Sequence, residues 1–574
     1  MASAMRRVLK GKYGLADLRA DVLAGIVVGI VALPLSMALA IAVGVPPQHG
    51  LYTAIFAGAL VALLGGSKFQ VTGPTAAFVV ILAPIVSAHG LTGLLTAGFM
   101  AGLMLVAMGI ARMGRLIQYI PHPVTTGFTT GIATVIATLQ IKDMAGLQVG
   151  PMPEHFTDKV AMLWAARGTV SLQELGVAVA TLGLLLGIPR LTRRIPAPLL
   201  AIGAVSAVGA LLHHFLPAFT VATIGTRFQT VVDGVTVAGI PPVLPVPAMP
   251  WGSTLDLRVL RELFPAAFAI AMLGAIESLL SAVIADGMTG KRHDPDAELV
   301  GLGIGNLVAP IFGGIAATGA LARTATNIRA GARSPVAAVT HAFVILVSIV
   351  ALAPLVAYVP MASLAAMLIL VAYNMSEVES FTRVVRVAPK SDVAILLACY
   401  GFTVIFDMVI AVTVGVLLAA VLFMRRMAEM TQSRTLLESI SEDSDRRIPP
   451  GVALYEINGP LFFGAAQSAM GAMHTIRGDT FVVMVLDLGK VPVIDSTGLV
   501  ALETAISKLC SNRKHVILAG PLPKPSRVWE KAKLEQRYAG LEVAPSLEEA
   551  LRRAEVLAAQ PPPAPRSQRG HAHA

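Results

Sequence analysis

The sequence predicts a polytopic α-helical membrane protein that ends in a soluble α/β domain. Hydrophobic residues make up 55% of the 574 residues and charged residues only 14%, whereas a soluble protein has about 25% charged residues. Hydrophobic runs follow one another as far as residue 424, and the hydropathy falls sharply after Arg425 and Arg426. An alternation of strand and helix patterns begins at residue 451. These three observations separate a membrane part from a soluble part.

The composition also excludes several classes of protein. The net charge is +10, but no basic stripe with interleaved aromatic residues is present, so we expect no nucleic-acid partner. The two cysteines, Cys399 and Cys510, are far apart, which predicts neither a disulfide framework nor a metal site. The sequence has no Walker A loop and no nucleophile–base constellation, so we expect neither ATP-driven transport nor a membrane enzyme. The first hydrophobic run lacks a small-residue cleavage site and is interpreted as a first span.

The hydrophobic runs, together with the more polar segment 318–332, give fourteen predicted membrane segments. They are 22–43, 51–64, 71–88, 93–111, 124–140, 174–189, 197–216, 263–285, 299–315, 318–332, 335–357, 361–373, 391–406 and 408–424. Several are shorter than the ~20 residues that a simple span needs. This is expected if some of them are half-helices.

The positions of the basic residues predict the orientation of these segments. With the N-terminus in the cytoplasm, the short outside turns contain no Lys or Arg, and the short inside loops contain all of the following: Lys68, Arg112, Arg115, Arg190, Arg193, Arg194, Lys291, Arg292, Arg329, Arg333, Arg383, Arg386 and Lys390. This is the positive-inside pattern. It holds only if 318–332 is counted as a membrane segment, and it places both termini in the cytoplasm.

Two similar stretches divide the membrane part into halves of seven segments. Thr72-Gly73-Pro74-Thr75-Ala76-Ala77 and Thr318-Gly319-Ala320-Leu321-Ala322-Arg323 each open the third segment of their half. An odd number of segments per half forces the halves into opposite orientations, so we expect an inverted repeat. Breaks of this kind at membrane depth are tolerated only against protein or a water-filled cavity. Two helix N-termini that face each other across such a cavity suit an anion.

Glu277 and Arg323 are the charged candidates for the site. A carboxyl group within a span usually faces a cavity and marks an ion or proton path, so Glu277 is the candidate for proton coupling; the alternative is a protonated Glu277 bonded to a backbone carbonyl. Arg323 lies just after the second break, where a guanidinium can attract an anion. Its alternative is a structural ion pair with Glu277.

Hydroxyl groups near the breaks are further candidates. Ser36 follows Pro34, which kinks the first segment, and its hydroxyl meets either the local backbone or the substrate. Thr324 offers a donor beside Arg323. Asp286, Asp294, Asp296 and Glu298 resemble a metal site, but basic residues are interspersed with them, so a solvated loop is expected and no metal.

The soluble part is expected to begin after a polar linker, 431–450. Strands are predicted at 452–457, 482–488 and 515–519, and helices at 496–510 and 546–558. The last residues, 559–574, are rich in proline and predicted to be disordered. Asp495 and Ser496 precede the first helix, where a phosphate on Ser496 would be favoured; the alternative is an ordinary helix cap.

The chain resembles the SulP (sulfate permease-like) anion transporter family with a C-terminal STAS domain. The resemblance lies in Asp21–Ile26, Gly50–Thr53, Gly65–Ser67, Val71–Ala76, Asn306–Gly314, Gly459–Phe463 and Asp495–Gly498. It implies a mobile core domain and a gate domain in 21–430, a cytoplasmic STAS domain in 451–558, and 1–20 as a cytoplasmic segment. It also implies a homodimer that works by elevator-like alternating access, with substrate between the third and tenth segments.

Within this family the chain is similar to the bacterial aerobic C4-dicarboxylate transporters. Pro34–Ile41, Thr75–Leu82, Tyr373–Glu377 and Phe406–Ile410 carry this resemblance. It implies proton-coupled uptake of succinate, fumarate, malate and aspartate across the inner membrane. Sulfate or bicarbonate is the alternative substrate, and with bicarbonate the coupling ion is sodium. A sensor or scaffold that signals to a protein partner through the STAS domain is the alternative of another class.

The resemblance carries particular residues into the predicted site. The implied substrate-binding residues are Ser36, Gly73, Pro74, Thr75, Ala76, Glu277, Ser278, Ala322, Arg323 and Thr324. Many relatives have Ser before the arginine, whereas this chain has Ala322. The change removes one hydroxyl donor and leaves that position without a side-chain contact. No cofactor is implied, and the expected surroundings are membrane lipid.

Overall fold

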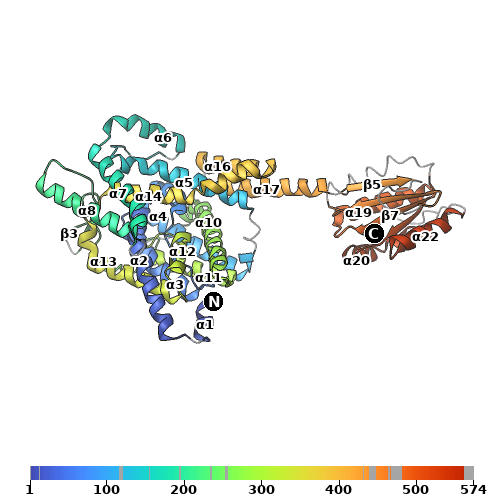
Figure 1. Cartoon of the computed structure of the whole chain (residues 1–574), viewed down its shortest axis with the longest axis horizontal. Helices are drawn as coiled ribbons and strands as arrows, with labels where there is room; N and C mark the ends of the chain where they lie inside the picture. Colours follow the sequence, from blue (N-terminus) through green and yellow to red (C-terminus); the bar gives the residue numbers. More distant parts are fainter. Residues whose placement is uncertain are drawn as a thin grey trace. The chain divides into compact units, whose positions relative to one another are not determined.

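The structure is a computed structural model that divides into two compact units, Met1–Leu417 and Leu418–Ala574. It describes residues 2–11, 13–115, 121–150, 152–153, 155–192, 196–232, 235–252, 256–406, 408–430, 432–437, 448–462, 466 and 481–560. Figure 1 shows the first unit as a bundle of helices and the second as a sheet with helices. Residues 561–574 of the predicted disordered tail lie outside the described residues.

The first unit consists almost entirely of helices. Its first half contains α1 (Ser3–Leu9), α2 (Leu15–Val43), α3 (Gln48–Leu64), β1 (Thr72–Gly73), α4 (Ala76–Ile110), α5 (His122–Met144), α6 (Phe156–Ala165), the 3₁₀ turn η2 (Ala166–Thr169), α7 (Leu172–Leu191) and α8 (Ala197–Phe215). The rest contains α9 (Ile224–Arg227), β2 (Gln229–Val232), β3 (Val235–Ala238), α10 (Leu257–Thr289), α11 (Pro295–Ile311), β4 (Thr318–Gly319), α12 (Leu321–Arg329), α13 (Val336–Val356), α14 (Met361–Met375), α15 (Val378–Val387) and α16 (Lys390–Ile405). Helix α17 (Met408–Met430) crosses the boundary of the two units.

Every predicted membrane segment overlaps a helix, and the segments 71–88 and 318–332 also contain the short strands β1 and β4. Two of the segments share α4, which is interrupted at Gly90 with φ 65° and ψ −167°, a conformation that is essentially restricted to glycine. Eight helices among the described residues are long and apolar enough to cross a membrane. The structure differs in smaller elements: α1, α6, α15 and the hairpin β2–β3 were not predicted, since they lie in polar or amphipathic stretches outside the hydrophobic runs.

The helices of the first unit pack in two groups. In one group α4 packs against α10 and α11, and α2 packs against α3 and α13. In the other group α5 packs against α14 and α16, and α7 packs against α8 and α14. The short helix α12 lies in the first group against α2 and α10. The first group therefore contains both of the predicted breaks.

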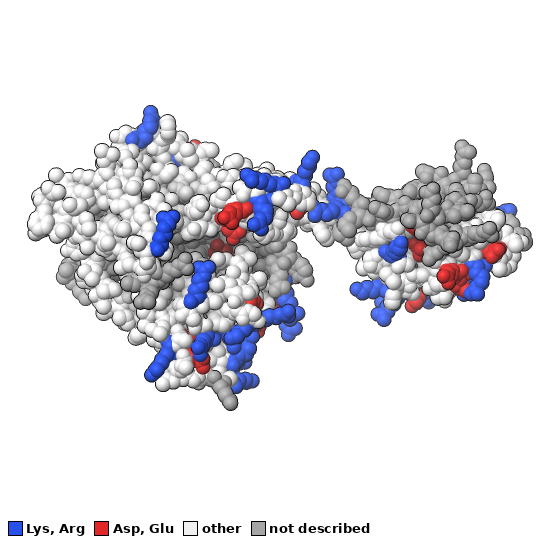
Figure 2. Space-filling view, in the orientation of Figure 1, with Lys and Arg blue, Asp and Glu red and all other residues white. Residues whose placement is uncertain are grey.

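The outer surface of the first unit is apolar over wide areas. Figure 2 shows broad regions of this unit without Lys, Arg, Asp or Glu. Large apolar side chains of this unit are exposed, including Phe215 at 69%, Leu355 at 66% and Phe343 at 62%. Exposed apolar surface of this extent marks contact with lipid or another protein, as expected for helices that cross a membrane.

A buried carboxylate connects the start of α2 to the loop after α12. Asp21 is completely buried and accepts hydrogen bonds from the Tyr13 hydroxyl at 2.8 Å, from the Arg333 N–H at 2.6 Å and from the Ser334 N–H at 3.0 Å. Burial and the contact with Asp21 raise the pKa of Tyr13 to about 12, so its hydroxyl remains a donor. This carboxylate fixes the loop at the C-terminal end of α12.

The second unit is an α/β domain with the strand order β5-β6-β7-β8-β9. Its elements are β5 (Gln432–Leu437), β6 (Val452–Asn458), β7 (Val483–Lys490), α19 (Ser496–Ser511), β8 (His515–Ala519), α20 (Pro523–Ala532), α21 (Leu534–Arg537), β9 (Leu541–Ala544) and α22 (Leu547–Ala558). Strands β6 to β9 are parallel, and β5 is antiparallel to β6. Side chains of α19 and α20 pack on one face of the sheet and those of α22 on the other.

The range expected to be a polar linker, 431–450, differs from that expectation. Its residues Gln432–Leu437 form β5, which pairs with β6 from Gln432↔Asn458 to Leu437↔Ala453. An edge strand needs only one hydrogen-bonded neighbour, and its polar residues can face water. The polar composition of this stretch therefore did not indicate a strand.

Candidate functional site

The two predicted breaks meet inside the first group of helices. Strands β1 and β4 pair antiparallel, with Thr72 opposite Gly319 and Gly73 opposite Thr318. Both strands are buried. A further backbone hydrogen bond runs from the Ala320 N–H to the Val71 carbonyl at 2.9 Å. The pairing satisfies backbone groups that lipid could not, which explains how the chain can leave the helical conformation twice at this depth.

Two helices start at this crossing and run away from it. Helix α4 begins at Ala76, three residues after β1, and α12 begins at Leu321, two residues after β4. Because the two strands are antiparallel, the helices leave in opposite directions and their N-termini face each other. The side chains of the N-cap residues Thr75 and Ala320 accept no hydrogen bond from the N–H groups of the first helical turns. The positive ends of two helix dipoles therefore converge on one place.

Arg323 of α12 adds a fixed positive charge to the crossing. Its side chain is 2% exposed, and its Nη2 donates to the Pro74 carbonyl at 2.6 Å. A Cβ added to Gly73 would collide with the Arg323 Nη1, so the glycine leaves the space that the guanidinium occupies. Within the described part of the chain no carboxylate pairs with Arg323, and the alternative of an ion pair with Glu277 is not realised.

Glu277 of α10 lies at the start of α4. Its Oε2 accepts a hydrogen bond from the Thr75 hydroxyl at 2.9 Å, and its side chain is half-buried. The carboxyl group is therefore bonded to a hydroxyl, not to the backbone carbonyl of the alternative interpretation. An ionised Glu277 places a negative charge at the positive end of α4, where a bound anion would also be stabilised.

Polar side chains of three elements hold the crossing in position. The Gln70 Nε2 donates to the Ser278 Oγ at 2.6 Å. The Thr324 Oγ1 accepts from the Val71 N–H at 3.1 Å and from the Ser281 hydroxyl at 3.3 Å. The hydroxyl groups of Ser278 and Thr324 thus hold the chain before β1, α10 and α12 together. This geometry assigns them a supporting place at the site.

The ten residues predicted for substrate binding divide into two sets. Gly73, Pro74, Thr75, Ala76, Glu277, Ser278, Arg323 and Thr324 are brought together by the contacts around β1. Ala322 lies in the first turn of α12 and is exposed. Ser36 is completely buried in α2, which packs against α4 and α12, and its hydroxyl has no partner among the described residues.

Sequence reasoning missed three side chains of this region. Gln70 and Thr72 flank the first break, and His341 of α13 is completely buried. The Gln70 Oε1, the Thr72 Oγ1 and both His341 ring nitrogens have no hydrogen-bond partner in the part of the chain that the structure describes. The sequence does offer one sign of His341, because it is a single histidine within an otherwise apolar segment. A lone histidine indicates a functional site less strongly than a carboxylate such as Glu277 does.

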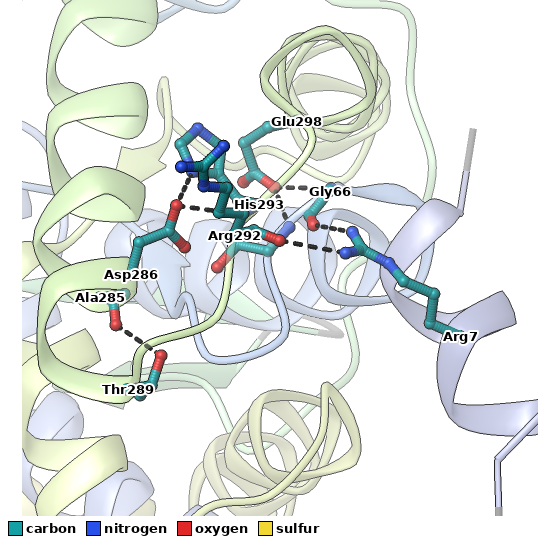
Figure 3. Close-up of polar contacts among 9 residues, drawn as sticks. Arg7, Gly66, Ala285, Asp286, Thr289, Arg292, His293 and Glu298 are labelled. Atoms are coloured by element: carbon teal, nitrogen blue, oxygen red, sulfur yellow. Dashed lines mark hydrogen bonds and ion pairs between the residues drawn. The ribbon is translucent and has the colours of Figure 1, made fainter.

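The acidic cluster after α10 was expected to be a solvated loop, and this expectation was wrong. Glu298 is 1% exposed and accepts from the Gly66 N–H at 2.7 Å and the Ser67 N–H at 2.9 Å. Asp286 accepts from the His293 backbone and pairs with its ring. Figure 3 shows Arg7 of α1 donating both to the Arg292 carbonyl in this loop and to the Gly66 carbonyl after α3. These carboxylates accept hydrogen bonds from backbone N–H groups. The sequence does not show that Gly66 and Ser67 lie next to Glu298 in the fold. Among the described residues no cluster has the composition of a metal site.

A separate cavity of about 770 Å³ lies between the two groups of helices. It is lined by the C-terminal end of α2 (Ile41–Gly44), by the part of α4 before Gly90 (Ala83, Pro84, Val86 and Ser87) and by residues of α5. Lys142, Lys159 and Arg227 bring three positive charges to its wall, and Asp143 brings one negative charge, which pairs with Arg227 at 2.7 Å. The net charge of the cavity wall favours an anion.

In the second unit Asp495 caps α19. Its Oδ1 accepts from the Gly498 N–H at 2.7 Å, which is the ordinary capping role. Ser496 is the first residue of the helix and is exposed. A phosphate on its hydroxyl would lie at the positive end of α19, so the regulatory role of Ser496 stays a prediction.

Comparisons with known proteins identify this architecture. Residues 18–399 match the sulfate permease family. The chain belongs to this family. Residues 444–550 match the STAS domain, so the second unit contains a STAS domain. Both assignments agree with the resemblance that the sequence motifs carry.

Individual relatives cover nearly the whole chain. The chain is 41% identical over 522 residues to the putative sulfate transporter YvdB of Bacillus subtilis (strain 168), covering 91% of this chain and 95% of YvdB. It is 29% identical over 569 residues to the bicarbonate transporter BicA of Picosynechococcus sp., covering 95% and 96%. The murine anion transporter Slc26a9, in its inward-facing state, matches with a TM-score of 0.84 at 17% identity over 97% of this chain and 94% of that chain. The last likeness concerns the fold alone.

Proposed function

We propose that the chain is a secondary transporter that carries small anions across the bacterial inner membrane, with the anion bound between the N-termini of α4 and α12. The observation that carries this proposal is the convergence of two helix N-termini with a buried Arg323 that no described carboxylate neutralises. A cation kept out of water needs a counter-charge. A transported anion supplies this negative counter-charge and can leave again when it is released.

Proton coupling follows from the place of Glu277. An ionised Glu277 bonded to Thr75 repels an anion that approaches the start of α4. Binding a proton removes this repulsion, so the proton and the anion favour each other's binding. A carrier that switches between outward-facing and inward-facing states only when the proton and the anion are both bound performs symport. Sodium at the same carboxylate is the alternative coupling ion.

For the substrate we propose C4-dicarboxylates such as succinate, fumarate, malate and aspartate. The motifs Pro34–Ile41 and Tyr373–Glu377 support this choice. Sulfate and bicarbonate are the second candidates, and the relatives favour them: YvdB is named a putative sulfate transporter and BicA a bicarbonate transporter. All of these anions are small oxyanions that suit converging backbone N–H groups.

The proposed cycle is of the elevator type. The group of helices that contains α4, α10 and α12 would move as the core, and the group that contains α5, α7 and α14 would form the gate. The antiparallel pairing of β1 with β4 supports two inverted repeats of seven segments. The positive-inside pattern supports cytoplasmic termini, and we propose a homodimer with a STAS domain that binds a cytoplasmic protein.

Uptake into proteoliposomes tests the proposal. Purified protein is reconstituted, and entry of labelled succinate, sulfate and bicarbonate is measured with and without an inward proton gradient. Gradient-stimulated succinate uptake that fumarate blocks and sulfate leaves intact supports the dicarboxylate proposal. Movement of sulfate or bicarbonate in place of succinate keeps the site and changes the substrate. If none of the three anions moves, the scaffold that signals through the STAS domain becomes the better interpretation.

A further inference from the structure

His341 is a polar side chain at a buried position of the apolar helix α13. It lies in α13, is completely buried, and has no hydrogen-bond partner for either ring nitrogen among the described residues. A neutral imidazole always carries one N–H donor and one acceptor, and buried polar groups almost always have partners. Leaving both nitrogens unpaired would cost more than placing a leucine there.

The ring of His341 lies beside β1. A Cβ added to Gly58 of α3 would be 3.2 Å from the Thr72 carbonyl oxygen and 3.9 Å from both Cε1 and Nδ1 of His341. The absence of a side chain at Gly58 thus leaves room between the imidazole and the strand.

Arg323 reaches the next residues of the same strand. Its Nη2 bonds to Pro74, and its Nη1 lies against Gly73. Its Nε and Nη1 are buried without a partner among the described residues. Arg323 at Gly73 and His341 near the Thr72 carbonyl therefore lie beside neighbouring residues of β1.

We propose that ordered water joins His341 to Arg323 behind β1, and that His341 acts through this water as a positioning residue for the guanidinium. This inference rests on the proposed function, in which Arg323 binds the anion. A buried water typically makes about three hydrogen bonds to groups that otherwise lack partners. Unpaired nitrogens of His341 and Arg323 supply such a set.

The role of this water follows from the geometry of Arg323. The hydrogen bond to Pro74 anchors only one of the three nitrogens of the planar guanidinium. A second anchor on the far side fixes the plane, so that the remaining donors face the crossing. Water-mediated bonds are nearly as favourable as direct ones, which lets His341 act on Arg323 without touching the anion.

Two substitutions of the same residue test the inference. His341→Leu fills a similar volume without hydrogen-bonding groups, and His341→Gln keeps one donor and one acceptor. Phe343→Leu, at an exposed position of the same helix, is the control. Transport of the anion that wild type carries best is measured in proteoliposomes for KM and maximal rate, and unfolding temperature is measured in detergent.

The expected result separates positioning from folding. His341→Leu should unfold at the wild-type temperature or above, since it removes unpaired buried groups, and should raise KM about tenfold with a maximal rate within about twofold of wild type. His341→Gln should restore KM to within about threefold. Wild-type KM in His341→Leu would overturn the inference, as would a loss in His341→Gln equal to that in His341→Leu.

A map of the wild-type protein that resolves ordered water is the second measurement. Density bonded to both His341 and Arg323 supports the inference, and a dry contact between apolar surfaces overturns it. This measurement decides the matter even if His341→Leu fails to fold. It also separates the two proposals: if wild type moves no anion, the proposed function fails, whereas the water behind β1 is still present or absent.

Discussion

Glu277 is the residue on which proton coupling depends in the proposed cycle. In Glu277→Gln the side-chain oxygen can still accept from the Thr75 hydroxyl, but the group can no longer gain or lose a proton. We therefore expect gradient-driven accumulation to fall to the level without a gradient, while exchange of labelled for unlabelled anion persists. Both are measured in proteoliposomes. Glu262→Gln, at an exposed position of the same helix, is the matched control and should accumulate anion normally.

The outcome at Glu277 also separates a carrier from a scaffold. Full proton-driven accumulation in Glu277→Gln would remove this residue from the coupling mechanism. A scaffold would move no anion in either form and would keep any protein partner at its STAS domain.

For single residues, the sequence predicted which residues form the breaks better than it predicted their hydrogen-bond partners. Gly73 and Pro74 were identifiable because they interrupt a helix where lipid cannot satisfy the backbone, and Arg323 because a charged side chain is rare at membrane depth. The bond between Thr75 and Glu277 depends on how α10 is rotated against α4, which no periodicity reports. His341 was missed because a single histidine in an apolar run is the usual sign of a core residue. Its unpaired nitrogens become visible only when its neighbours are known.

At the scale of elements, the crossing of β1 and β4 depends on the missing side chain of Gly73. In Gly73→Ala the new methyl group would occupy the place of the Arg323 Nη1. The end of a flexible side chain yields more easily than backbone, so we expect the guanidinium to move and the fold to persist. The KM for the transported anion should rise about tenfold or more, with a nearly unchanged unfolding temperature.

Gly98→Ala is the matched control for this substitution. Its added Cβ would be 3.6 Å from the Pro310 Cγ, an ordinary contact. Equal transport by both alanine variants and wild type would show that the position of Arg323 does not matter for binding.

The loop after α12 depends on the buried carboxylate of Asp21. Asp21→Asn loses the charge and presents an amide group to donors from Tyr13, Arg333 and Ser334. Hydrogen bonds to charged groups contribute about 1.5–3 kcal/mol each, so we expect a destabilisation on the order of 3 kcal/mol. Thermal unfolding in detergent measures it. Asp17→Asn breaks an exposed pair with Arg333 and should change the unfolding temperature little.

If Asp17→Asn lowered the unfolding temperature as much as Asp21→Asn, the loop would be held by surface charge and not by the buried carboxylate.

The elements themselves were predictable to different degrees. The long helices follow from apolar runs, and the division of α4 follows from Gly90, since the adjoining residues are polar enough to form a turn. Strand β8 begins and ends where its apolar run predicts. Strand β5 and helix α12 were harder, because one is polar and at a sheet edge and the other is a half-helix with Arg323 and Asn327 buried. In both cases pairing with another element, not local composition, decides the structure.

At the scale of the whole membrane unit, the cavity between the helix groups is placed to collect anions. The proposed orientation puts it on the outer side of the membrane. Lys142→Gln removes one of its three positive charges. We expect uptake at low anion concentration to fall about twofold to fivefold, with an unchanged maximal rate, because the charge raises the local concentration of anion.

Salt provides the internal check on this prediction. The difference between Lys142→Gln and wild type should shrink as ionic strength rises, since the Debye length falls to ~8 Å at 0.15 M. Lys390→Gln, at an exposed position at the start of α16, should behave as wild type at all salt concentrations. A salt-independent defect in Lys142→Gln would indicate a structural role for this lysine.

The central claim is that the transported anion binds at the crossing of β1 and β4 against Arg323. Equilibrium binding of the labelled anion to the purified protein tests it most directly, with Arg323→Gln compared with Arg329→Gln, an exposed arginine on the same helix. We predict that Arg323→Gln weakens binding at least about tenfold, while Arg329→Gln binds as wild type does. Equal binding by wild type and Arg323→Gln would place the anion elsewhere and contradict the account.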